Sequence, residues 1–293
     1  MSHTIQSLYR NILLRLKTIY FAEEAKAIAD RVIEHFFYHT PVQRAISGNL
    51  PVSDLQVQDV EIAVGRLMQN EPLQYVLGTA WFMDMEFDVS PAVLIPRPET
   101  EELVSLILKW YKDTKPGIPL RVLDIGTGSG CIAVAIKRNI PGACVTALDI
   151  SEGALSVAKS NADKLNADVE FLQCDILGEQ HWHDHRYYDV IVSNPPYVTR
   201  SEEHKMLSNV LNFEPHAALF VPDNDPLLFY RAIIRFAKNR LHDHGTLWFE
   251  INESYGEDLK QLTLDHGFKD VNIIFDFQGK SRFLQCHSTN SPF

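Results

Sequence analysis

The chain has 293 residues, of which 45% are hydrophobic and 22% are charged, and its formal net charge is −11 at pH 7. No stretch approaches the roughly eighteen uninterrupted apolar residues of a membrane span, so we expect no membrane association. Residues 81–293 carry −10 of the charge and residues 1–80 only −1, and because an acidic surface repels a phosphate backbone, we expect no stable direct binding to nucleic acids.

The first 78 residues predict a small helical bundle. Apolar residues recur at helical spacing, first at Ile5, Leu8, Ile12, Leu16 and Ile19 and then at Ile28, Val32 and Phe36. Thr40 and Pro41 are typical of a helix start, with threonine as the cap and proline at the first helical position. Ser53 and Gln56 form a capping box that opens a helix through about Gln69. We therefore predict an N-terminal helical substrate-recognition domain over residues 1–78.

Residues 79–95 predict a hairpin linker. Residues 80–82 and 86–89 are strand-like and are separated by residues 83–85. Pro91, Pro96 and Pro98 then stiffen the chain. The second domain is expected to span residues 96–293.

From Glu99 onward, strand-like and helix-like segments alternate, which predicts a mostly parallel, doubly wound α/β sheet with helices on both faces. The strand candidates are Arg121–Ile125, Ala143–Asp149, Val169–Gln173, Tyr188–Ser193, Thr246–Glu250, Val271–Phe275 and Arg282–Cys286. The helical candidates are Glu101–Lys112, Cys131–Asn139, Ser151–Leu165, Pro226–Leu241 and Glu257–His266. In such a sheet, ligands bind outside the carboxyl ends of the strands at the topological switch point.

The first predicted strand of this sheet ends in a glycine-rich turn, Gly126-Thr127-Gly128-Ser129-Gly130. Three alternate glycines let the backbone turn sharply and come close to a ligand. Nineteen residues after Gly130, Asp149 ends the second predicted strand, where its carboxylate can accept both hydrogen bonds of a ribose diol. The turn and the carboxylate together indicate a cofactor that contains adenosine.

Two cofactor classes are compatible with this turn. Residues 128–133 also satisfy the G-x-G-x-x-A form of the dinucleotide fingerprint. Asp124, just before the glycines, favours S-adenosylmethionine, because that molecule carries a cationic sulfonium and an amino group and has no pyrophosphate. Asp175, at the end of the third strand, would add a polar contact to adenine. A turn or helix-capping role accounts equally well for either aspartate taken alone.

The fourth predicted strand runs directly into Asn194-Pro195-Pro196-Tyr197. Consecutive prolines fix two backbone torsions and remove two N–H donors, so the loop presents carbonyl oxygens and the Asn194 side chain in a preset geometry. An amide or aniline-type NH2 group has a delocalised lone pair and is a poor nucleophile. Its hydrogens can be accepted by the Asn194 oxygen and the Pro195 carbonyl, and Tyr197 can supply a flat wall.

This interpretation predicts catalysis by positioning, with the sulfonium as an activated leaving group and no general base required before transfer. A structural Pro-Pro turn after a strand is the alternative. The strand before Asn194 and the strand that carries the glycine turn both end at one edge of the sheet. This shared edge favours the catalytic interpretation of the Asn194 loop.

Other candidate sites are weaker. Residues 181–185 place three histidines at alternate positions, but in an expected loop, so we predict no metal site. Cys131 opens a helix and is expected to be a buried small hydrophobe. The cysteines show no Cys-x-x-Cys spacing, and residues 1–5 lack the features of a signal peptide. Reduced thiols without a signal peptide predict a cytoplasmic protein.

Five linked motifs resemble those of the HemK/PrmC-type release-factor glutamine methyltransferases. They are, in the family's order, Glu71–Gly78, Leu94–Glu101, Asp124–Gly130, Asn194–Tyr197 and Phe213–Leu219. The similarity covers nearly the whole chain. It implies a small helical bundle followed by a class I (Rossmann-like, seven-stranded) S-adenosylmethionine-dependent methyltransferase domain.

The resemblance also implies an activity and its residues. Relatives of this type methylate the glutamine side-chain amide in the Gly-Gly-Gln motif of class I peptide chain release factors. By the same resemblance, Gly126–Gly130, Asp149 and Asn194 would contact the cofactor, and Asn194–Tyr197 would grip the glutamine. Relatives often have an aromatic residue after the third-strand aspartate, whereas this chain has Ile176, an aliphatic residue that can still pack on a purine face.

Three other functions are each compatible with part of the sequence. A DNA or RNA amino-methyltransferase shares the Asn-Pro-Pro-Tyr motif, but the acidic second half and the lack of a basic recognition region disfavour it. A nicotinamide-dependent oxidoreductase is compatible with the glycine turn but leaves Asn194–Tyr197 unexplained. A non-enzymatic binding module is disfavoured by the intact pair of sites.

Overall fold

The computed structural model describes residues 3–114, 119–179, 182 and 186–288, and over these residues the chain divides into two compact units. The first unit comprises Met1–Thr79 together with Leu207–Phe213, and the second comprises Ala80–Met206 and Glu214–Phe293. The segment Leu207–Phe213 therefore belongs to the helical unit although it is distant from it in the sequence.

The first unit is helical, as predicted. Its helices are α1 (Ile5–Leu16), α2 (Ala22–Phe37), α3 (Pro41–Ser47), α4 (Asp54–Leu67), α5 (Leu73–Leu77) and α9 (Ser208–Phe213). The predicted caps are confirmed, because Thr40 and Ser53 both form capping boxes with the residue three positions later. Ile19, expected on the apolar stripe of the first helix, is instead 47% exposed, since α1 ends at Leu16 and the chain turns away from the helical register.

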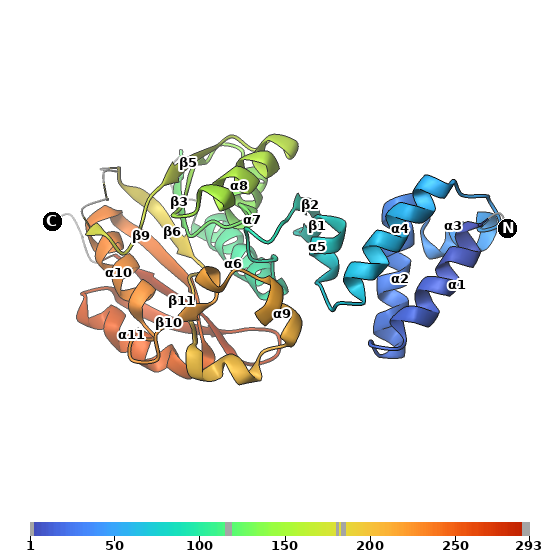
Figure 1. The fold of residues 1–293 in the computed structure, drawn as a ribbon. Coiled ribbons are helices and arrows are strands. Elements are labelled where there is room, and N and C mark those ends of the chain that lie inside the picture. The colour runs from blue at the N-terminus through green and yellow to red at the C-terminus, as the bar shows by residue number, and fades with distance from the viewer. Residues whose placement is uncertain (1–2, 115–118, 180–181, 183–185, 289–293) are drawn as a thin grey trace. The chain divides into compact units, whose positions relative to one another are not determined.

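In the described residues, the second unit has a seven-stranded sheet in the order β10-β11-β9-β6-β3-β4-β5, which confirms the predicted fold class (Figure 1). The strands are β3 (Arg121–Ile125), β4 (Cys144–Asp149), β5 (Val169–Gln173), β6 (Tyr188–Ser193), β9 (Leu241–Glu250), β10 (Lys269–Phe275) and β11 (Ser281–His287). Neighbouring strands are parallel from β9 to β5, whereas β11 is antiparallel to both of its neighbours.

Helices cover both faces of this sheet. They are α6 (Pro98–Thr114), α7 (Cys131–Asn139), α8 (Glu152–Lys164), α10 (Leu228–Arg240) and α11 (Gly256–Asp265). The shorter elements are β1 (Thr79–Phe82), β2 (Met85–Asp88), β7 (Val198–Thr199), β8 (Phe220–Val221), η2 (Arg200–Lys205), η3 (His216–Ala218) and η4 (Glu253–Tyr255). The predicted hairpin linker corresponds to β1 and β2, and its turn residues Met83 and Asp84 both have positive φ, as a tight hairpin turn requires.

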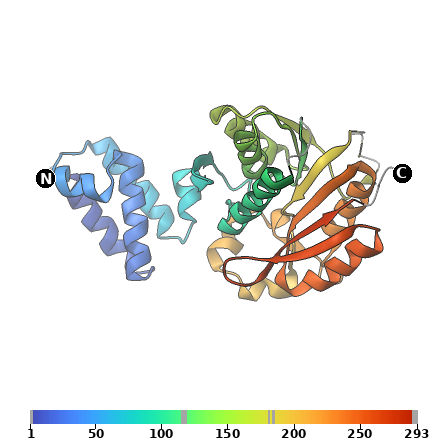
Figure 2. The same ribbon diagram turned by 180° about the vertical axis from the view of Figure 1, so that it is seen from behind.

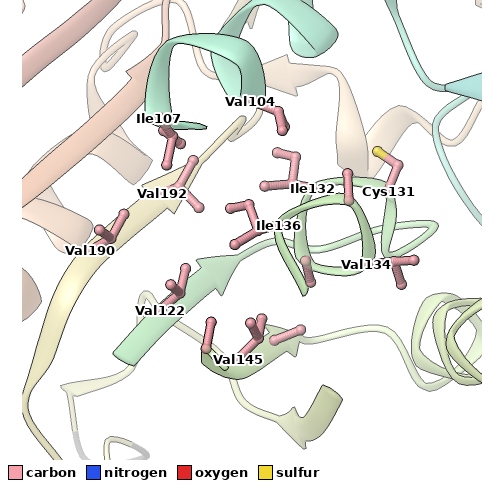
Figure 3. Close-up of a cluster of buried hydrophobic side chains, with 14 of the residues drawn as sticks. Val104, Ile107, Val122, Cys131, Ile132, Val134, Ile136, Val145, Val190 and Val192 are labelled. Atoms are coloured by element: carbon pink, nitrogen blue, oxygen red, sulfur yellow. The ribbon is translucent and has the colours of Figure 1, made fainter. Parts of the chain in front are cut away.

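Alternate residues of each strand enter different hydrophobic cores. Val122 and Val192 pack with Ile107 of α6 and Ile136 of α7 on one face (Figure 3). Leu123, the neighbour of Val122, packs with residues of α10 and α11 on the other face. Figure 2 shows α6 and α7 on the side of the sheet opposite to α10 and α11. Burial on both faces explains why the strands are apolar runs in the sequence.

The switch point of the sheet lies at β3. This strand pairs with β4 on one side and with β6 on the other, so that Ile125 is opposite both Leu148 and Ser193. The carboxyl ends of β3, β4 and β6 therefore lie at one edge, where a doubly wound sheet binds its ligands. Across the described part of the chain, no helix is both long and apolar enough to cross a membrane.

Candidate active site

The glycine turn after β3 depends on backbone conformations that favour glycine. Gly126, Gly128 and Gly130 have φ values of 73°, 55° and 81°. A Cβ atom on Gly126 or Gly128 would meet no protein atom within 4 Å, so within the protein only their torsions favour glycine. A Cβ atom on Gly130 would lie 3.1 Å from the Ala158 Cβ atom, so this glycine also lets α8 pack closely against the turn.

Asp149, at the end of β4, is fixed by backbone donors on both sides. Its Oδ2 accepts a hydrogen bond from Gly128 N at 2.9 Å, and its Oδ1 accepts one from Ser151 N at 2.9 Å. Each carboxylate oxygen can accept a second hydrogen bond. The carboxylate is therefore held in place with acceptor capacity remaining for a diol.

Asp124 lies beneath the turn rather than at its surface. It is fully buried, and Thr127 Oγ1 donates a hydrogen bond of 2.6 Å to its Oδ2. Burial raises the pKa of Asp124 from 3.8 to about 7. The Asp124 side chain is not among the lining residues of the cavity described below, whereas Thr127, which donates to it, is one of them. Strand alternation directs Asp124 away from the face to which Leu123 and Ile125 belong.

Asn161 of α8 supports the same turn, and it was not among the residues predicted from the sequence. It is fully buried, and its Nδ2 donates to the carbonyl oxygens of Ser129 and Asp88, both at 2.9 Å. Its Oδ1 accepts from Asp88 N at 2.6 Å. One side chain thus ties the glycine turn to the hairpin strand β2. An asparagine within a helix was the available signal, since its side chain is often exposed there unless it has specific partners.

A cavity of about 370 Å³ opens at the carboxyl edge of the sheet within the second unit. Of the residues predicted from sequence, those that line it are Gly126, Thr127, Gly128, Ser129, Asp149, Asp175, Ile176, Asn194, Pro195 and Pro196. Gly130 and Tyr197, like Asp124, are not among its lining residues in the described chain. The two loops singled out from sequence therefore face one common space.

The two residues predicted to lie beside adenine, Asp175 and Ile176, follow β5, which is the third strand predicted for the sheet. Asp175 Oδ1 accepts a hydrogen bond from Leu177 N at 2.9 Å, which shapes the turn that follows β5. Ile176 is buried at the cavity wall, and its carbonyl accepts from Trp182 Nε1 at 3.1 Å. Phe229 of α10 provides an aromatic lining residue that sequence reasoning missed, because its position depends on how α10 packs on the sheet.

The Asn194 loop is fixed to the glycine turn and to the interior. Ser193 Oγ donates to the Ile125 carbonyl at 2.7 Å, which ties the ends of β6 and β3 together. Asn194 Nδ2 donates to Thr100 Oγ1 at 3.1 Å. Tyr197, expected to form a flat wall, donates its hydroxyl to Glu250 Oε1 at 3.1 Å, and burial raises the pKa of this hydroxyl well above its usual value.

Two further segments of the sequence meet at the cavity rim through an ion pair. Arg97 Nη2 donates to Glu214 Oε1 at 2.6 Å, and Ile95 N donates to Glu214 Oε2 at 3.3 Å. The Glu214 carboxylate is nearly inaccessible, whereas Arg97 lines the cavity and is about one-third exposed. This contact joins the segments 94–101 and 213–219, which are two of the five motifs named above.

The histidine segment and Cys131 are the remaining candidates from the sequence. Of the expected histidine segment, His181, His183, Asp184 and His185 lie outside the described residues. Within the described residues, no group of three or more His, Cys, Asp or Glu side chains could hold a metal ion. Cys131 is buried beside the cavity, and burial raises its thiol pKa to about 12.

The chain is similar to known proteins along nearly its whole length. Residues 7–78 match the family described as PrmC N-terminal domain, and residues 105–219 match the Methyltransferase small domain. A release factor glutamine methyltransferase from Bacteroides thetaiotaomicron is 43% identical over 93% of this chain and 96% of its own length. One from Koribacter versatilis is 46% identical over 76% of each chain.

Solved structures agree on the fold. A methyltransferase from Pyrococcus furiosus is 18% identical, with a TM-score of 0.51, over 76% of this chain and 96% of its own. At this identity the similarity concerns the fold alone.

Proposed function

The chain belongs to the release factor glutamine methyltransferase family, and we propose that it methylates the side-chain amide nitrogen of the glutamine in the Gly-Gly-Gln motif of class I peptide chain release factors. It is an S-adenosylmethionine-dependent methyltransferase. The observation that carries the proposal is that the glycine turn after β3 and the Asn194 loop after β6 line one cavity.

The residues of the cavity fit S-adenosylmethionine. The positive φ values of Gly126 and Gly128 open the turn so that backbone can approach a ligand, and Asp149 keeps acceptor capacity for a ribose diol. We assign Asp175 and Ile176 to the adenine side of the cavity. When bound, S-adenosylmethionine supplies a methyl group on a sulfonium, which is an activated leaving group. Asp124 acts through the turn, by holding Thr127.

Asn194 and Pro195 would orient the substrate nitrogen. The side-chain oxygen of Asn194 and the carbonyl oxygen of Pro195 can each accept one hydrogen of a planar NH2 group. Fixing both hydrogens aligns the nitrogen and lets its lone pair develop, so catalysis would come from positioning and electrostatics. Tyr197 is anchored at Glu250 and would support the loop from behind.

Substrate docking is assigned to the helical unit. Residues 1–78 correspond to the PrmC N-terminal domain match, which covers residues 7–78. We propose that this unit contacts the release factor, that the catalytic domain spans residues 96–293 after the linker at 79–95, and that the protein works in the cytoplasm, where translation takes place. No stable direct nucleic-acid binding is expected from the acidic second unit.

Asn194→Ala tests the assignment of the reacting loop. We expect kcat to fall by roughly 10²-fold, because an oriented acceptor at the reacting group is lost, while the dissociation constant of S-adenosylmethionine changes far less. Steady-state kinetics and calorimetry measure the two quantities. Full turnover in this variant would remove Asn194 from the mechanism.

A further inference from the structure

A chain of hydrogen bonds runs from Asn194 into the interior of the second unit. Asn194 Nδ2 donates to Thr100 Oγ1 at 3.1 Å, and Thr100 Oγ1 donates to Glu250 Oε2 at 2.7 Å. Thr100 is 3% exposed and Glu250 is 1% exposed. The three residues come from the loop after β6, from α6 and from the end of β9, so no local sequence pattern predicts the chain.

The direction of this chain follows from chemistry. An ionised carboxylate accepts hydrogen bonds and cannot donate them, whereas a threonine hydroxyl has one hydrogen to donate. Since that hydrogen points to Glu250, Thr100 Oγ1 is left as an acceptor toward Asn194. The NH2 group of Asn194 must therefore face Thr100, and its Oδ1 is turned the other way.

The second oxygen of Glu250 is also occupied as an acceptor. Tyr197 donates its hydroxyl to Oε1 at 3.1 Å, and the buried Tyr230 hydroxyl donates to the Glu250 backbone carbonyl at 3.0 Å. Burial raises the pKa of Glu250, while the bonds from Thr100 and Tyr197 and the charge of Arg282 oppose that rise. Each of the two Glu250 carboxyl oxygens thus accepts one hydrogen bond, as expected for the ionised form of the side chain.

We propose that Thr100 and Glu250 are positioning residues that hold the Asn194 amide with its oxygen toward the substrate, and that they thereby select a carboxamide over a carboxylate. A glutamine NH2 group donates to Asn194 Oδ1. A glutamate carboxylate at the same place offers only acceptors, so it meets an acceptor and is rejected. The inference rests on the proposed function and identifies what enforces its substrate class.

Variants at Thr100 separate positioning from packing. Thr100→Val keeps the shape of the side chain but lacks the hydroxyl that joins Asn194 to Glu250, and Thr100→Ser restores that hydroxyl. We expect Thr100→Val and Glu250→Gln to lower kcat for a release factor by about tenfold or more, which corresponds to the loss of roughly one oriented hydrogen bond. Thr100→Ser should recover to within about threefold of wild type, and S-adenosylmethionine affinity should stay within about twofold in all three.

The preference of the enzyme for glutamine over glutamate is a second measurement, and a purely structural role of Thr100 would leave this preference unchanged. The dissociation constants of a release factor with Gly-Gly-Gln and of its Gln→Glu variant are measured against each enzyme. We expect wild type to prefer glutamine by about tenfold or more, and Thr100→Val to reduce that preference to about threefold or less. Thr263→Val is the matched control, because Thr263 is fully buried, donates to the Leu259 carbonyl at 2.7 Å and lies on α11.

The outcomes distinguish the two levels of the proposal. An active wild-type enzyme whose kcat and glutamine preference are both unchanged in Thr100→Val would overturn the inference and leave the function intact. Equal losses in Thr100→Ser and Thr100→Val would overturn it as well. Absence of methylation by the wild-type enzyme would contradict the proposed function, and the inference with it. Thermal unfolding of each variant identifies a Glu250→Gln protein that has failed to fold, in which case the Thr100 pair decides.

Discussion

Asp124→Asn removes a titrating carboxylate from beneath the glycine turn and nearly preserves its shape. Burial raises the pKa of Asp124 from 3.8 to about 7 in the folded protein. Because the folded pKa is above the unfolded one, the contribution of this group to stability is complete below about pH 4 and is lost as the pH rises through about 7. A shift of about three units corresponds to about 4 kcal/mol.

The free energy of unfolding of wild type should therefore fall, relative to that of Asp124→Asn, by up to about 4 kcal/mol between pH 4 and pH 8. Urea unfolding of both proteins without cofactor, at several pH values, measures this difference, in which the other titrating groups cancel. Asp163→Asn, on the exposed side of α8, is the control for loss of a surface charge. A difference that is constant from pH 4 to pH 8 would refute the reasoning.

Three further predictions concern the same edge of the sheet. Gly130→Ala should cost about 2–4 kcal/mol of unfolding free energy, since a Cβ atom there would press on Ala158, whereas Gly128→Ala should cost only about 1 kcal/mol for its torsion; equal losses in denaturant unfolding would contradict this. Asp149→Ala should weaken S-adenosylmethionine binding by about 1–3 kcal/mol in calorimetry, and unchanged affinity would argue against the ribose assignment. Glu214→Gln should lower the thermal unfolding midpoint and cost about 1–3 kcal/mol, because the partner arginine is left at a partly buried site; an unchanged midpoint would show that the ion pair contributes nothing.

Most of the fold was predictable because the strands of the large sheet and most of the helices leave a local mark in the sequence. The strands are apolar runs since both faces of the sheet are buried, and the capping boxes at Thr40 and Ser53 fix where helices begin. The prediction that Ile19 belongs to the apolar stripe of the first helix was wrong, because spacing alone does not reveal that α1 ends at Leu16. The return of Leu207–Phe213 to the helical unit is a tertiary feature with no local mark.

The candidate site was predictable where its residues follow strand ends directly. The glycine turn and Asn194 lie together because Ile125 pairs with Ser193, and the order of strands implies that neighbourhood. The contacts that individual side chains make were not predictable. Asp124 was expected to face the ligand and lies beneath the turn, and Tyr197 was expected at the cavity wall and reaches Glu250. Such contacts between distant segments depend on tertiary packing, which local patterns in one sequence do not reveal.

Methyl transfer to a defined nitrogen is the most direct measurement. The enzyme is incubated with isotopically labelled S-adenosylmethionine and either a class I release factor or the same factor with its Gly-Gly-Gln glutamine changed to alanine, and the product is mapped by mass spectrometry. One labelled methyl group should be found on that glutamine, and none on the alanine variant. Label of equal amount in both proteins, or at another residue, would contradict the claim that the cavity holds a glutamine amide.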